Sequence, residues 1–66
     1  MEVIINGTRH QVASQMSLAQ AVSLLTTSAS GVAAAINGEV VRRPAWESTR
    51  LAAGDQVEVI TAVQGG

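Results

Sequence analysis

The sequence predicts an α+β domain in which one helix lies across one face of a mixed β-sheet. Two Asn-Gly pairs, at residues 6–7 and 37–38, each separate two short extended segments, a pattern typical of β-hairpins. One segment with helical periodicity lies between them, and an alternating segment lies near the end of the chain. A single helix must bury its apolar stripe against a sheet, so the predicted order of elements is β-β-α-β-β-β.

The first hairpin is expected over residues 1–13. Residues 2–5 are mostly apolar and β-branched, and residues 8–12 can form the return strand. Asn6 and Gly7 both accept the positive φ angles that a two-residue hairpin turn requires.

The helix is expected to begin after Ser17. Ser17 and Gln20 have the spacing of a capping box, in which each side chain accepts a hydrogen bond from the other residue's backbone N–H. Thr26, Thr27 and Gly31 favour other structures, so the helix should fray near Thr27 and a loop should follow. Apolar residues recur on one helical stripe, which Leu24 widens: Leu18, Ala21, Val22 and Leu25.

The second hairpin is expected over residues 32–36 and 39–42, where two apolar segments flank the second Asn-Gly pair. Pro44 should end its second strand, because proline has no N–H to donate. Residues 45–48 then predict an irregular or single-turn connection, in which Trp46 acts as a core plug or loop anchor.

The last strand is expected over residues 56–63, after a turn at 53–55. Residues 64–66 (Gln-Gly-Gly) predict a flexible tail. The chain therefore divides into one domain, residues 1–63, and a C-terminal tail, residues 64–66.

Alternation along the strands predicts which side chains the helix covers. Successive strand residues point to opposite faces, so one face should hold Val3, Ile5, Val57 and Val59. Ile4 and Ile60 should lie on the other face, where 66 residues leave no second layer to cover them. They form either a docking surface for a partner or two singly exposed apolar residues, and both readings have similar weight.

Composition and charge exclude several classes of protein. The 66 residues are 47% hydrophobic and 14% charged, which is typical of one small globular domain. A net charge of −1 and a single aromatic residue argue against a nucleic-acid partner. The longest apolar run, residues 32–36, is too short to cross a membrane. The N-terminal sequence does not resemble an export signal, so we expect a cytoplasmic protein.

Reactive side chains are scarce in this sequence. It has no cysteine and no lysine, and His10 is its only histidine. These absences leave no thiol nucleophile and no side-chain amine for a Schiff base, and we expect no metal site or bound cofactor. A chain terminus is therefore a serious candidate for any covalent chemistry.

The residues from Gly31 onward form a distinctive pattern. It consists of Val32-Ala33-Ala34-Ala35-Ile36-Asn37-Gly38-Glu39-Val40-Val41, Trp46, Leu51, Gly54-Asp55, the strand from Val57 and the ending Thr61-Ala62-Val63-Gln64-Gly65-Gly66. This pattern resembles the ThiS family, the sulfur carriers of thiamine biosynthesis. The resemblance covers essentially the whole chain and is strongest from Gly31 onward, above all in the ending. The element order, followed by Gly-Gly, is similar to the ubiquitin-like β-grasp fold.

The resemblance implies a carrier rather than an enzyme. A ThiF-type adenylating enzyme would activate the Gly66 carboxylate with ATP, and a sulfur-relay protein would then convert it to a thiocarboxylate. A ThiG-type thiazole synthase would use that sulfur to form the thiazole ring of thiamine. Gly65 would give the tail the clearance to enter a narrow active site. The surface that binds these partners would include Ile4, Ile60, Ala62 and Gln64.

Three other functions are compatible with the sequence. The first is the small subunit of molybdopterin synthase, which shares this fold and also ends in Gly-Gly. Members of that family are usually longer and richer in aromatic residues. A ubiquitin-like modifier would be conjugated to protein lysines. A non-covalent β-grasp module would bind partners without any reaction at its C-terminus.

Overall fold

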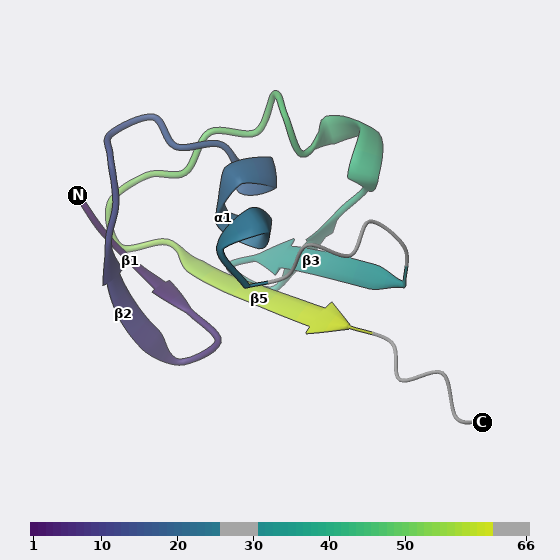
Figure 1. Cartoon of the computed structure of the whole chain (residues 1–66), viewed down its shortest axis with the longest axis horizontal. Helices are drawn as coiled ribbons and strands as arrows, with labels where there is room; N and C mark the ends of the chain where they lie inside the picture. Colours follow the sequence, from purple (N-terminus) through teal and green to yellow (C-terminus); the bar gives the residue numbers. More distant parts are fainter. Residues whose placement is uncertain (26–30, 62–66) are drawn as a thin grey trace.

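The computed structural model describes residues 1–25 and 31–61 of the chain (Figure 1). In this part of the chain the predicted order β-β-α-β-β-β is confirmed, with a short 3-10 turn before the last strand. The elements are β1 (Glu2–Ile5), β2 (Thr8–Gln11), α1 (Leu18–Leu25), β3 (Val32–Ile36), β4 (Glu39–Val41), the 3-10 turn η1 (Arg43–Ala45) and β5 (Gln56–Thr61).

The described strands form one five-stranded mixed sheet with the order β2-β1-β5-β3-β4. The pairs β1–β2, β3–β4 and β3–β5 are antiparallel, whereas β1 and β5 run parallel. The last strand in the sequence therefore lies in the middle of the sheet, between the two hairpins. Figure 1 shows that β5 runs away from the end of the molecule at which the N-terminus lies.

The two Asn-Gly turns have the backbone conformation that the sequence predicts. The φ angles of Asn6 and Gly7 are 50° and 81°, and those of Asn37 and Gly38 are 52° and 86°. All four values lie in the left-handed region, which asparagine and glycine tolerate better than other residues. Both predicted hairpins are confirmed, although β4 ends at Val41 rather than one residue later.

The predicted capping box is also present at the N-terminus of α1. The Ser17 N–H donates to Gln20 Oε1 at 2.9 Å, and the Gln20 N–H donates to Ser17 Oγ at 3.1 Å. These bonds pair two polar groups that the first helical turn leaves without backbone partners.

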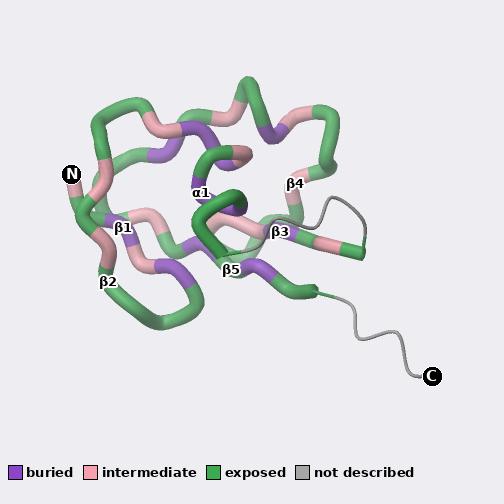
Figure 2. Tube along the Cα trace, in the orientation of Figure 1, coloured by how far each residue is buried: buried purple, intermediate pink, exposed green. Residues whose placement is uncertain are grey.

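The core lies between α1 and one face of the sheet, which we call the inner face. All four strand residues predicted to face the helix are buried, as are three residues of the helix. Figure 2 shows buried segments in the helix and in the strands beside it. The core cluster consists of Val3, Ile5, Leu18, Ala21, Val22, Ala34, Trp46, Leu51, Val57 and Val59.

The helical stripe ends earlier than the sequence predicts. Leu24 and Leu25 are 56% and 43% exposed, so neither belongs to the core. Leu25 lies one turn beyond Val22, about 4.5 Å further along the helix axis. The prediction that the buried stripe includes Leu25 is therefore wrong, because the core is centred on the first turn of α1. The predicted fraying near Thr27 and the loop at 26–30 lie outside the described residues.

Trp46 is buried, as expected for a core plug and loop anchor. Its Nε1–H donates to the carbonyl oxygen of Val41 at 2.8 Å, and the Arg43 guanidinium lies 5.3 Å from the centroid of its ring. The single-turn connection begins at Arg43, two residues earlier than predicted, and Pro44 lies inside it. Proline suits the start of such a turn, where its missing N–H is not required.

Candidate partner-binding face and the end of β5

The end of β5 is the described part of the chain that lies next to the predicted reactive tail. The C-terminal half of β5 pairs with β3, where Thr61 lies opposite Val32 and Ile60 opposite Ala33. On the other side, the backbone N–H of Asn6 donates to the carbonyl oxygen of Val57 at 2.9 Å. Both edges of β5 are therefore hydrogen-bonded, one to β3 and the other to β1 and Asn6, until shortly before the strand ends.

Ile60 lies on the outer face of the sheet, opposite the helix, and is 64% exposed. In the antiparallel register Ala33 lies opposite Ile60, and Ala35 lies between Glu58 on β5 and Val40 on β4. Directly paired residues share a face of the sheet, so these apolar side chains are neighbours. We call this set the outer patch: Ala33, Ala35, Val40 and Ile60.

Sequence reasoning missed most of the outer patch. Val40 is 77% exposed, more than any other large hydrophobic residue of the described chain, and it was not among the predicted site residues. Alternation within residues 32–36 and 39–41 could have placed Ala33, Ala35 and Val40 on one face. Their proximity to Ile60 depends on the pairing of β3 with β5, which alternation alone does not give.

Ile4 lies on the outer face but not in the outer patch. It pairs with Gln56, four residues before Ile60 on β5. A rise of about 3.3 Å per residue places the two isoleucines roughly 13 Å apart along the strand, and the exposed Glu58 lies between their levels. The structure thus places both residues opposite the helix, as expected, and does not bring them together.

Charged side chains flank the outer patch. Glu58 is exposed beside Ala35, at the margin of the outer patch. The backbone of Arg42 is extended, with φ −71° and ψ 145°, so alternation places this residue on the same face as Val40. An apolar centre with a charged margin is the usual composition of a protein-binding surface.

The other predicted site residues lie outside the described part of the chain. They are Ala62, Gln64, Gly65 and Gly66, together with Val63 at the end of the predicted strand. The predicted tail of residues 64–66 is among them.

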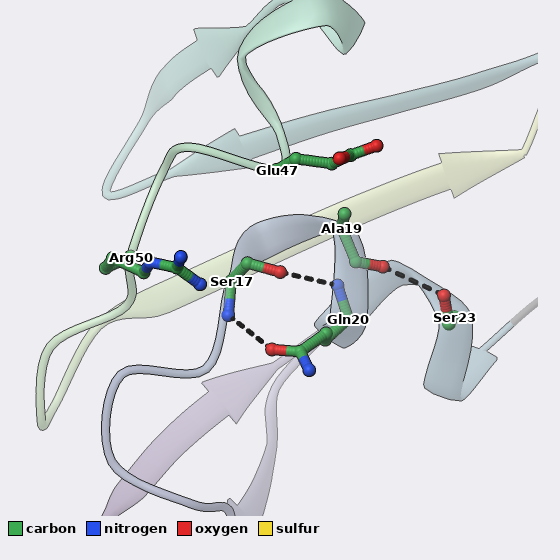
Figure 3. Close-up of a pocket in the computed structure, with 6 residues that line it drawn as sticks. All are labelled: Ser17, Ala19, Gln20, Ser23, Glu47 and Arg50. Atoms are coloured by element: carbon green, nitrogen blue, oxygen red, sulfur yellow. Dashed lines mark hydrogen bonds between the residues drawn. The ribbon is translucent and has the colours of Figure 1, made fainter.

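Polar side chains also gather in a hollow beside the N-terminus of α1 (Figure 3). It is lined by Ser17, Ala19, Gln20, Ser23, Glu47 and Arg50. Ser17 and Gln20 form the capping box, and Ser23 Oγ donates to the carbonyl oxygen of Ala19 at 2.9 Å. Arg50 donates instead to the carbonyl oxygen of Gln15 at 3.4 Å, in the loop before the helix. Three of the six lining residues, Ser17, Gln20 and Ser23, therefore have hydrogen bonds that stabilise the helix.

The part of the chain that the structure describes holds neither a cluster of metal ligands nor a membrane-spanning helix. In residues 1–25 and 31–61, no group of three or more His, Asp or Glu side chains is placed to hold a metal ion. The helix in this part of the chain is too short to span a membrane.

A mixed sheet of this order, with one helix on its inner face and a Gly-Gly ending in the sequence, defines a ubiquitin-like β-grasp protein. The model of the ThiS family matches residues 3–66. The chain therefore belongs to the ThiS family, the sulfur carriers of thiamine biosynthesis, as its resemblance to them indicated.

Solved structures agree with this assignment. The chain is similar to the crystal structure of the thiamine biosynthesis protein ThiS from Geobacter metallireducens, with 32% identity and a TM-score of 0.82, over 100% of both chains. A solution NMR structure of a thiamine biosynthesis protein from the same organism is 30% identical, with a TM-score of 0.80. That match covers 100% of this chain and 88% of the other. No curated protein matches the chain.

Proposed function

We propose that this protein carries sulfur on its C-terminus for the thiazole ring of thiamine. The Gly66 carboxylate attacks the α-phosphorus of ATP in a ThiF-type adenylating enzyme, which releases pyrophosphate and leaves an acyl adenylate. Hydrosulfide (HS⁻) supplied by a relay protein then attacks the acyl carbon: a C–S bond forms, the C–O bond to AMP breaks, and a thiocarboxylate is left. The thiocarboxylate donates its sulfur in a ThiG-type thiazole synthase.

Membership of the ThiS family carries this proposal, because the family match extends to residue 66 and so includes the Gly-Gly ending. The chemistry of the sequence supports it as well. A free carboxylate is a poor electrophile, so it requires a leaving group such as AMP before sulfur can be added. A thiocarboxylate is a sulfur nucleophile that needs no cysteine, and this chain has none.

The two glycines suit the proposed entry of the tail into an active site. Neither Gly65 nor Gly66 has a Cβ, so the tail is as narrow as a polypeptide can be. Glycine also adopts backbone angles that other residues resist. In this proposal the chain binds no cofactor of its own, and ATP belongs to the adenylating enzyme.

The outer face is the proposed docking surface for these enzymes. Ile60 and Val40 together present exposed apolar area close to the strand that leads into the tail. Contact with a partner would remove this area from water, which stabilises a complex by about 25 cal/mol per Å² of apolar surface. Ala62 and Gln64 follow directly in the sequence and complete the proposed contact, with Ile4 at its far margin.

The intact mass of the protein isolated from cells that synthesise thiamine tests the proposal. Replacement of one oxygen by one sulfur is the expected result, and it should disappear in cells that lack the adenylating enzyme. A mass increased by a ligated protein would instead indicate a modifier. An unchanged mass in wild-type cells would contradict the carrier function.

A further inference from the structure

The side chain of Asn6 forms two hydrogen bonds with the backbone of β5, 53 residues away in the sequence. The Val59 N–H donates to Asn6 Oδ1 at 2.8 Å, and Asn6 Nδ2 donates to the carbonyl oxygen of Val59 at 3.1 Å. The primary amide of Asn6 therefore pairs with both backbone polar groups of one residue near the end of β5.

These bonds continue the β1–β5 ladder beyond the point at which β1 stops. The regular parallel register ends at the pair Ile5–Val57, and the Asn6 N–H still donates to the carbonyl oxygen of Val57. In a regular ladder the next two bonds to Val59 would come from the backbone of residues 6 and 8. The chain turns away at Asn6-Gly7 into β2, and the Asn6 side chain supplies both bonds instead.

Val59 is buried and lies two residues before Thr61, where the described part of β5 ends. The other side of β5 is held by β3 as far as Thr61, so Asn6 holds the end of the strand on the β1 side. The proposed function requires the tail to be drawn out in a narrow active site of a partner, where the five residues from Thr61 to Gly66 could span up to about 17 Å. A rotation of Thr61 by only a few degrees would then displace the far end of such a chain by roughly 1 Å.

We propose that Asn6 is a positioning residue for the C-terminal reaction: it fixes the end of β5 and so sets the direction in which the tail leaves the sheet. This inference rests on the proposed carrier function. Reactions of a bound group are sensitive to misplacement of about 1 Å, which can cost on the order of a hundredfold in rate. Asn6 does not touch the reacting atoms, and its effect passes through Val59 and Thr61.

Asn37 provides a matched control within the same chain. It occupies the same position of the other Asn-Gly turn, with a φ angle of 52° against 50° for Asn6. Its side chain also binds β5, but at the opposite end: Asn37 Oδ1 accepts from the Gln56 N–H at 2.9 Å, and Nδ2 donates to Asp55 Oδ1 at 3.1 Å. The two asparagine side chains thus form similar hydrogen bonds at the two ends of one strand.

The test compares Asn6→Gly with Asn37→Gly. Glycine accepts the positive φ angle of either turn, so each substitution removes the side-chain bonds without straining the backbone. Amide hydrogen exchange should accelerate at Val59 in Asn6→Gly and at Gln56 in Asn37→Gly. ATP–pyrophosphate exchange with the cognate adenylating enzyme should show kcat lowered on the order of tenfold for Asn6→Gly, with KM nearly unchanged. Asn37→Gly should retain the wild-type kcat.

Thermal melts of both variants separate positioning from stability, because a purely structural role would lower kcat equally in two variants of equal stability. If Asn6→Gly does not fold, Asn6→Asp keeps an acceptor for Val59 and should show a smaller loss of kcat than that expected for Asn6→Gly. If the wild-type protein is active and a folded Asn6 variant has the same kcat, the positioning role of Asn6 is overturned and the proposed carrier function is not. An inactive wild-type protein would overturn the proposed function, whereas hydrogen exchange would still test the bond to Val59.

Discussion

Leu18 and Leu25 lie two turns apart on the same side of α1, yet Leu18 is fully buried and Leu25 is 43% exposed. The helix therefore packs through its first turn and a half. Leu18→Ala should leave a cavity and lower the free energy of unfolding by about 2–5 kcal/mol, a large share of the total for a domain of this size. Denaturant unfolding, followed by the fluorescence of the buried Trp46, measures this change.

Leu25→Ala is the matched control for this prediction. The same truncation at Leu25, which is 43% exposed, should cost only about 1 kcal/mol, because less apolar area returns to water and no enclosed cavity forms. Equal shifts of the denaturation midpoint in the two variants would contradict the placement of the core on the first turn of α1.

Ile60→Glu should weaken binding to the adenylating enzyme while leaving the fold intact. The side chain is 64% exposed, so the folded protein accommodates a carboxylate there. In the complex that charge would be removed from water against an apolar surface, which is costly without a partner. Titration calorimetry with the adenylating enzyme should show a Kd increased on the order of tenfold or more, with a melting temperature close to that of the wild type.

Leu24→Glu controls for the introduction of a charge at an exposed leucine or isoleucine. Leu24 is 56% exposed and lies on the helix, away from the outer face of the sheet. We expect wild-type affinity for this variant. A loss as large as that of Ile60→Glu would show that added charge, rather than the outer patch, disturbs binding.

Deletion of Gly66 should abolish adenylation. The variant still ends in a carboxylate, but that group is one residue short, roughly 3.3–3.6 Å in an extended chain. In-line attack on ATP requires placement at the ångström scale, so ATP–pyrophosphate exchange should fall by at least about a hundredfold. The deletion does not touch the packed core and should leave the thermal melt unchanged. Normal exchange by this variant would contradict the carrier function.

Gly65→Val should also prevent adenylation. A β-branched side chain restricts the backbone of the tail and widens it. Thr61→Val is its control, because residue 61 is already β-branched, exposed and extended in β5. The same exchange assay should find Thr61→Val close to wild type, and equal activity of both valine variants would show that the tail needs no clearance at residue 65.

Neighbouring residues alone determined a large part of this fold. The Asn-Gly pairs dictate two tight turns because both residues tolerate positive φ angles, and Ser17 with Gln20 dictates the start of α1. Strand alternation correctly placed Val57 and Val59 inside and Ile60 outside, because the side-chain period of a strand is fixed by its covalent geometry. The resemblance to the ThiS family, which is strongest at the Gly-Gly ending, was likewise visible in the sequence alone.

The tertiary structure alone decided which distant residues meet. The insertion of β5 between β1 and β3 places Ile60 opposite Ala33, on the same face as Val40 of β4, and the parallel register places Ile4 beside Gln56 instead. The same placement gives the Asn6 side chain the backbone of Val59 as its partner. Sequence periodicity reports the face of each residue but contains no register, because register depends on pairing between strands that are remote in the chain.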